Sequence, residues 1–246
     1  MNLSRKQREI AQRHALFLDI ASNLLTEDGY HQLTMERIAE LAEYSKGTVY
    51  QHFSCKEEIL IQLCIASMSH LHALFSRASE FPGSHRDKIL GVFYAHELWT
   101  QHDKNAVDML QHLSMHGVRD KVSEESQTQH DKLEHGLVAL VTNIVVEAIN
   151  AGELPKQKTL TPPQIVFGLW SMSMGGQLLQ ASDLPLQEFG VENPGISLLR
   201  TVAATLDGYG WQPLGTEVHF KKLLKQFEGD WFDTVINSVN NDEPEL

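Results

Sequence analysis

The chain has 246 residues and a net charge of −12, and hydrophobic residues make up 42% of it. That hydrophobic content is typical of a globular protein and too high for a disordered one. No eighteen consecutive residues are apolar, and the N-terminus is charged, so we expect neither a membrane-spanning helix nor a signal peptide. The sequence therefore predicts a cytoplasmic protein without a membrane partner.

The negative charge is unevenly distributed along the chain. Residues 1–56 contain seven Lys/Arg and seven Asp/Glu, so residues 57–246 carry the whole excess of −12. Attraction to phosphate needs a positive surface, so the acidic part argues against non-specific binding to nucleic acid. Any DNA contact must come from the front of the chain, where Arg5, Lys6, Arg8 and Arg13 form a basic N-terminal arm. The alternative is that this arm is only a solubilising tail.

Apolar spacing predicts helices along almost the whole chain, and no alternating strand pattern occurs. The first helix, over 5–26, should stop at Gly29, because glycine tolerates the backbone conformation of a helix end. A short second helix should follow Thr34 and bury Ile38, Ala39 and Ala42. The remaining helices are expected over 45–53, 54–78, 85–101, 104–116, 123–150, 162–181, 195–208 and 216–238. The tail 241–246 should be disordered.

Residues 34–56 read as two short helices joined by a tight turn, which describes a helix-turn-helix. A recognition helix must enter a groove about 12 Å wide, so its leading residues should be small. Ser45, Gly47 and Thr48 meet that requirement. The side chains able to hydrogen-bond to bases or phosphates are those of Lys46, Tyr50, Gln51 and His52.

The apolar positions of the same segment should fix the second helix to the first. Val49 and Phe53 are expected to point back at Ile38 and Leu41. Phe53 and Tyr50 can also be read as ordinary core aromatics, and Lys56 as a solvated lysine. A lysine at a helix start is disfavoured by the helix dipole, which favours an anionic partner there.

About fifteen positions over residues 17–60 match the N-terminal domain of the TetR family of bacterial transcriptional regulators in order and spacing. The run is Phe17-Leu18, Ala21, Leu24-Leu25, Gly29-Tyr30, Thr34, Ile38-Ala39, Ala42, Ser45 to Tyr50, His52-Phe53, Lys56-Glu57 and Leu60. By this resemblance, Thr34, Tyr50, His52 and Lys56 would hold phosphates, and Ser45, Lys46, Thr48 and Gln51 would face base edges. The family usually has glycine in the turn, where this chain has Glu43 and Tyr44.

The resemblance implies an all-α protein that regulates transcription and uses no cofactor. Residues 1–53 would be the DNA-binding domain, and 54–240 a helical domain for ligand binding and dimerisation. Such a protein would repress transcription from a palindromic double-stranded operator until a small apolar or amphipathic effector releases it. Activation of transcription, or a role as a protein-interaction adaptor without DNA binding, are the alternatives. No phosphate loop, nucleophile elbow or zinc-protease motif supports an enzyme.

The effector pocket is expected among large, flexible apolar residues of the middle helices, with histidines as polar contacts. The predicted ligand-binding residues are Phe93, Trp99, Met109, His112, Met115, His116, Trp170 and Met174. Filling of the core is the alternative role for each of them. His112 and His116 share a helix face and could hold a metal if His96, Glu97 or His102 supplied a further ligand. Because the sequence has no local cluster of Cys, His and carboxylate residues, we predict no metal site.

The dimer interface is expected on the helices 162–181 and 195–208, where small residues allow close approach and leucines fill the seam. Its predicted residues are Gly168, Ser171, Gly175, Leu178, Leu198, Leu199 and Val202. A four-helix bundle formed by two copies is what the resemblance implies. Cys55 and Cys64 should stay reduced, because nine residues of helix separate them by roughly 13 Å.

Overall fold

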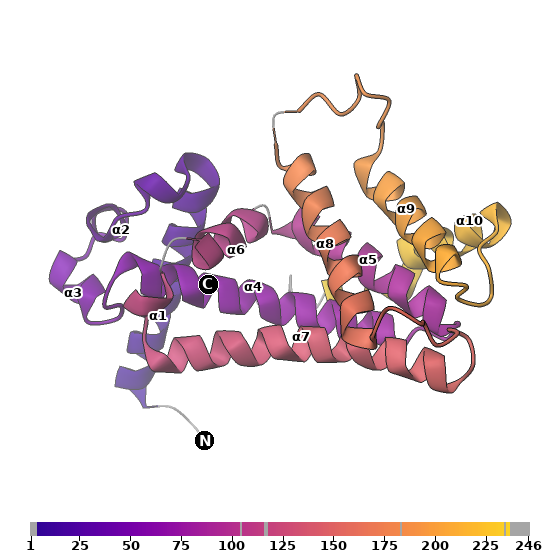
Figure 1. The fold of residues 1–246 in the computed structure, drawn as a ribbon. Coiled ribbons are helices and arrows are strands. Elements are labelled where there is room, and N and C mark those ends of the chain that lie inside the picture. The colour runs from indigo at the N-terminus through magenta and orange to yellow at the C-terminus, as the bar shows by residue number, and fades with distance from the viewer. Residues whose placement is uncertain (1–3, 104, 116–117, 183, 234, 237–246) are drawn as a thin grey trace. The chain divides into compact units, whose positions relative to one another are not determined.

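The computed structural model describes residues 4–103, 105–115, 118–182, 184–233 and 235–236, which form helices and turns without a strand (Figure 1). The described residues divide into two compact units. Unit 1 comprises residues up to Ser67 and Asp103–Lys132, and unit 2 comprises Met68–His102 and the chain from Leu133. These units differ from the predicted division at residue 53, because half of the fourth helix and the segment 103–132 join the first unit. The predicted disordered tail lies outside the described residues.

Unit 1 is built around the N-terminal helices. It contains α1 (Arg5–Asp28), α2 (Met35–Leu41), α3 (Lys46–Tyr50), the first half of α4 (Lys56–Ser79), α6 (Ala106–Met115) and the start of α7 (Glu124–Asn150). Short 3-10 turns at Tyr30–Gln32 and Arg119–Lys121, which the sequence did not predict, precede α2 and α7.

The predicted basic arm is part of α1. Ser4 caps this helix, since its hydroxyl accepts from the Gln7 N–H at 3.3 Å and the Gln7 side chain accepts from the Ser4 N–H at 2.9 Å. The helix ends at Gly29, whose φ of 77° is open to glycine and costly for other residues. The arm therefore presents its cations on a helix.

The hydrophobic core of unit 1 contains the residues that the apolar spacing selects. Phe17, Ile38 and Val49 are fully buried, and Ala39, Ala42 and Phe53 are nearly so. The expectation that Val49 and Phe53 pack against Leu41 is wrong, because Leu41 is 56% exposed and is not part of this core. As the last residue of α2, it lies where the chain leaves the core for the turn.

Unit 2 is built from the second halves of α4 and α7 with α5 (His85–His102), α8 (Pro162–Gln180), α9 (Pro194–Gly208) and α10 (Glu217–Gln226). Helices α5, α8 and α9 pack against one another. The single helix predicted over 216–238 is wrong, because α10 passes into a π-helical turn, Phe227–Trp231, in which Gly229 leaves helical backbone angles.

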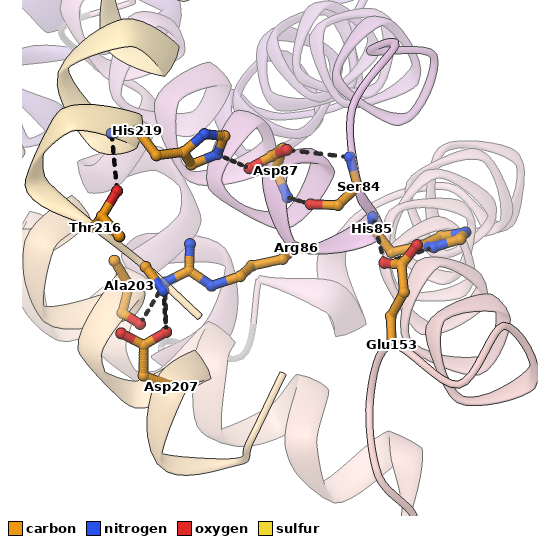
Figure 2. A network of polar contacts seen from close by, with 10 residues as sticks. Ser84, His85, Arg86, Asp87, Glu153, Ala203, Asp207, Thr216 and His219 are labelled. Carbon is orange, nitrogen blue, oxygen red and sulfur yellow. Dashed lines mark hydrogen bonds and ion pairs between the residues drawn. The ribbon is translucent and has the colours of Figure 1, made fainter. Parts of the chain in front are cut away.

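A buried guanidinium joins α5 to α9 in unit 2 (Figure 2). Arg86 is 1% exposed, and its Nη2 donates to the Ala203 carbonyl at 3.0 Å and to Asp207 Oδ1 at 2.8 Å. The neighbouring Asp87 contacts Nε2 of His219 on α10 at 2.7 Å. Two consecutive residues at the start of α5 thus hold two different C-terminal helices.

Two helices, α4 and α7, are long and apolar enough to span a membrane when mean hydropathy is used instead of an uninterrupted apolar run. This is weak evidence, because core helices of globular proteins have the same composition. The apolar window of α4 is 56% buried within the protein and that of α7 22%. The expectation of no such helix therefore fails by length and composition, and burial supports a core role for α4.

Unit 2 also buries a histidine that the sequence did not single out as a site. His96 on α5 lies with its Nδ1 3.3 Å from Ser173 Oγ and 3.4 Å from Gln177 Nε2, both on α8. Burial lowers the pKa of His96 from 6.5 to about 4. The imidazole is therefore neutral in the folded protein at pH 7.

This histidine should make stability depend on pH. Because the folded-state pKa lies below the unfolded-state pKa, only the unfolded chain binds a proton between pH 6.5 and about 4. Stability should therefore fall by on the order of 3 kcal/mol as the pH drops through that window. Urea unfolding at several pH values should give a flatter profile for His96→Gln than for the parent. Exposed His70→Gln is the control, and equal profiles for the parent and His96→Gln would contradict the assignment.

Candidate nucleic-acid interface

Two capped short helices form the helix-turn-helix in unit 1. The Thr34 hydroxyl accepts from the Arg37 N–H at 3.2 Å at the start of α2. The Ser45 hydroxyl accepts from the Thr48 N–H at 3.1 Å at the start of α3. Each cap satisfies a backbone donor that the helix leaves open, which favours helix formation at these residues.

The turn between α2 and α3 contains a residue in an unusual backbone conformation. Glu43 has a φ of 57°, in the left-handed region that glycine adopts most readily. The turn is closed by a hydrogen bond from the Tyr44 N–H to the Ala39 carbonyl at 2.9 Å. The chain therefore makes this turn with a glutamate in a backbone conformation that is strained for any residue other than glycine.

The outer face of α3 is polar and open. Lys46, Gly47, Tyr50 and Gln51 are exposed, with Tyr50 at 47%. A Cβ added at Gly47 would meet only the Ser45 hydroxyl, at 3.7 Å. The inner face carries buried Val49, so α3 presents one polar face to the outside and fixes the other in the core.

The two lysines of the segment lie in different environments. The Lys46 ammonium donates to Glu36 on α2, so its charge is compensated within the protein. The half-buried Lys56, at the start of α4, lies over the Tyr30 ring at 4.2 Å and has no carboxylate partner among the described residues. Lys56 is therefore the cation better prepared to accept an external anion.

His52 lies between α3 and α1. Its ring meets Phe17 edge-on at 5.3 Å and lies 5.7 Å from the His14 ring. Burial lowers the pKa of His52, and the nearby His14 and Arg13 add to that effect. A neutral imidazole can donate one hydrogen bond to a phosphate oxygen.

Helix α6 and the residue before it contact α1 and the 3-10 turn at Tyr30 within unit 1. The Asn105 side chain donates to Thr26 Oγ1 at 2.7 Å and to the Ser22 carbonyl at 3.3 Å, both on α1. The His112 ring stacks on Tyr30 with centroids 4.2 Å apart. Tyr30 therefore lies between α6 and Lys56, a link that the sequence analysis missed because no short-range pattern pairs residues 30 and 112.

This geometry agrees with comparisons to known proteins. Residues 17–63 match the description "Bacterial regulatory proteins, tetR family", which covers α1 to the first part of α4. The fatty acid metabolism regulator protein of Bacillus subtilis (strain 168) is 25% identical over 160 residues, 63% of this chain and 78% of that protein. Residues 17–63 are therefore a DNA-binding domain of the TetR type.

Relatives and solved structures agree with the TetR assignment. The regulator TtgR of Pseudomonas putida is 27% identical over 159 residues, 61% of this chain and 72% of that protein. A tetR-family protein from Rhodococcus RHA1 has the same fold, with a TM-score of 0.63 and 18% identity over 80% of this chain and 97% of that one.

A further similar structure is that of the regulator FadR from Bacillus subtilis in complex with stearoyl-CoA. The alignment spans 77% of this chain and 95% of FadR, with 21% identity and a TM-score of 0.56. The TetR-type domain and these relatives make the chain a DNA-binding transcriptional regulator and not an enzyme.

The predicted ligand-binding residues are divided between the two units of the TetR fold. Met109 and His112 belong to unit 1, whereas Phe93, Trp99, Trp170 and Met174 belong to unit 2. Phe93 and Trp99 are buried on α5, but Trp170 is 46% exposed. The side chain of Met115 and the whole of His116 lie outside the described residues.

The predicted dimer-interface residues also fall into two sets. Leu199 and Val202 are buried inside unit 2, and Leu198 lies against Gly176 there. Ser171 and Leu178 are exposed on α8, while Gly168 and Gly175 are half-buried. The exposed aromatic residues Phe167 (68%) and Trp170 lie on the same helix, and the sequence analysis had not assigned them to the interface.

The strained turn yields a prediction. Glu43→Gly should stabilise unit 1 by about 1 kcal/mol, because glycine adopts positive φ without the clash that a Cβ brings. Chemical unfolding monitored by circular dichroism measures the change. Glu43→Ala removes the same charge but keeps the Cβ, so equal stability of the two variants would contradict the explanation.

Proposed function

We propose that two copies of this chain bind a palindromic operator in the cytoplasm and repress transcription, and that an amphipathic anion releases them. The observation that carries the proposal is the polar, open face of α3 on a helix fixed in the core by Val49. Lys46, Thr48 and Gln51, with Ser45, would read base edges in the major groove. Thr34, Tyr50, His52 and Lys56 would hold the flanking phosphates.

The DNA contact is tested by a salt titration. The operator is recovered from a random duplex pool and compared with a scrambled duplex, for the parent, Tyr50→Phe and Lys56→Ala. Loss of one phosphate contact by Lys56→Ala should weaken both duplexes and lower the slope of log K against log salt by about one. Lys222→Ala on α10 is the control. Equal, weak binding to both duplexes by all variants would favour the adaptor alternative.

The second copy is expected on the exposed face of α8. Phe167, Trp170 and Leu178 recur at helical spacing and are 68%, 46% and 43% exposed. Exposed aromatics on one helix face favour a protein contact, and a two-fold axis pairs identical faces. Two recognition helices would then read half-sites about 34 Å apart.

The dimer has its own test. Trp170→Glu should convert the dimer to monomers in analytical ultracentrifugation and weaken operator binding at least tenfold, because each copy then binds one half-site. Leu184→Glu, at a 48% exposed position outside α8, is the matched control. A parent chain that sediments as a monomer at micromolar concentration would contradict the proposal.

An amphipathic anion suits a groove in unit 2. The groove, of about 410 Å³, lies between the end of α7, the segment 156–161 and the start of α8. Ile149, Leu160 and Ile165 give it an apolar wall. Lys156 and Lys158 border it without an ion-pair partner in the described part of the chain. A volume of this size is in the range of small-molecule sites.

The segment that borders the groove is fixed by hydrogen bonds of Gln157. The Gln157 side chain donates to the carbonyls of Pro155 and Tyr209, both at 2.8 Å, which fixes the segment before α8. The nearby carboxylate of Glu153 contacts His85 at 3.0 Å. Positive charge therefore remains at the groove in a strongly acidic chain.

Release of DNA would require that the effector change the free-energy difference between two arrangements of the recognition helices. Helices α4 and α7 each continue from one unit into the other along the chain. Within unit 1, α6 touches Tyr30 and, through it, Lys56. Displacement of α6 would therefore reach Lys56, a proposed phosphate contact, through the ring of Tyr30.

Stearoyl-CoA, the ligand in the FadR structure, is the first effector probe. It should weaken operator binding, whereas coenzyme A without the acyl chain should not. Lys156→Glu with Lys158→Glu should reduce the response at least tenfold, and Lys222→Glu with Lys225→Glu should leave it unchanged. An equal response of both double variants would overturn the assignment of the groove. A transcription assay with and without the probe separates repression from activation.

A further inference from the structure

The first turn of α2 is tied to the first turn of α3 by one ion pair. The Lys46 ammonium donates to Glu36 Oε1, and the two residues are ten apart in the chain. The side chains of Lys46 and Glu36 are 50% and 60% exposed. The hydrogen bond with Lys46 lowers the pKa of Glu36, and the same bond raises the pKa of Lys46. Both groups are therefore charged at neutral pH.

The ion pair between Lys46 and Glu36 can be broken with little loss of stability. Exposed ion pairs contribute little to stability, because water and salt screen them and because two long side chains must be ordered. The fold of unit 1 rests instead on its buried core and on the caps of α2 and α3. An ion pair that the fold does not need, on the helix that faces DNA, is free to act in binding.

Every DNA contact made by Lys46 would also require the free energy of breaking its ion pair with Glu36. To reach a duplex, the ammonium must leave Glu36, and the carboxylate then stands uncompensated near phosphates. Non-specific binding consists of phosphate attraction, which a charge already neutralised within the protein supports poorly. A guanine edge in the major groove offers two acceptors, O6 and N7, so it can offset the loss of the carboxylate.

We propose that Glu36 is a specificity residue, which holds Lys46 on the protein over non-specific DNA and releases it to base acceptors in the operator. The proposal rests on the DNA contact of Lys46 in the proposed function. Glu36 would touch no base itself and would act through Lys46. It would improve discrimination by weakening binding to wrong duplexes more than binding to the right one.

Other cations of unit 1 show that the pairing is not uniform. Arg37 contacts Asp28 at 2.8 Å and Arg5 contacts Glu9 at 2.9 Å, so these charges too are compensated. Lys56 lacks such a partner among the described residues. Non-specific attraction would then come from Lys56 and from Lys6 and Arg8 of the basic arm, for which the described residues also show no carboxylate partner. Lys46 is reserved for the correct sequence.

The test compares Glu36→Gln with Glu40→Gln. Glu40 is exposed on the same helix and has no ion-pair partner in the described part of the chain, so its variant removes an equal charge without releasing a lysine. Affinities are measured for the selected operator and a scrambled duplex between 50 and 200 mM salt, a range in which phosphate contacts change affinity strongly. Thermal unfolding checks that both variants fold.

Glu36→Gln should tighten binding to the scrambled duplex about tenfold and to the operator about twofold or less, so the specificity ratio should fall about fivefold or more. The salt slope on the scrambled duplex should steepen by about one, as Lys46 gains a phosphate. Glu40→Gln should tighten both duplexes equally and by a small factor. If Glu36→Gln does the same, the proposal is overturned.

Lys46→Ala separates this proposal from the one on which it rests. If Lys46→Ala leaves operator affinity unchanged, Lys46 does not contact the operator, and the proposed role of Glu36 is wrong as well. If Lys46→Ala weakens operator binding, Glu36→Gln should have no larger effect than Glu40→Gln in the Lys46→Ala background. A full Glu36→Gln effect without Lys46 would show that Glu36 acts by its own charge and would overturn the mechanism.

Discussion

The presentation of α3 depends on the burial of one side of a five-residue helix. A helix this short does not form alone in water, since nucleation consumes more free energy than one turn returns. Val49 has no exposed surface and Phe53 is 1% exposed, and both pack with Phe17 and Ile38 in the core of unit 1. The Ser45 cap then sets where the helix begins. Every contact that α3 could make with DNA inherits its geometry from these few residues.

The charged residues of the first 56 positions and those of the rest of the chain differ in balance. The whole acidic excess lies beyond residue 56, and the front is neutral because its seven cations equal its seven carboxylates in number. Three of those cations, Arg5, Arg37 and Lys46, contact carboxylates within the protein. Phosphate contacts alone would give a poorly selective protein, since phosphates are the same at every sequence. A neutral front makes binding depend on geometry, because an internal carboxylate is given up only for a well-placed acceptor.

The sequence predicted the helix-turn-helix and most helix positions correctly, because apolar spacing and caps are local signals. Ile38, Ala39 and Val49 are buried as the spacing requires, and no disulfide joins Cys55 to Cys64. Contacts between distant residues could not be predicted in the same way. The pairing of Lys46 with Glu36, the stacking of His112 on Tyr30 and the exposure of Leu41 and Trp170 depend on the packing of whole helices. Gly229 interrupts the last helix, although the apolar spacing continues on both sides of it.

The buried guanidinium of Arg86 has a consequence for how the protein is made. Its carboxylate partner, Asp207, is synthesised 121 residues later, so a nascent chain that ends before α9 would bury an uncompensated charge or leave α5 undocked. The core residues of the DNA-binding unit all lie between Phe17 and Ile59. The ribosome therefore releases the core of the DNA-binding unit long before unit 2 can close, and unit 2 must wait for nearly the whole chain.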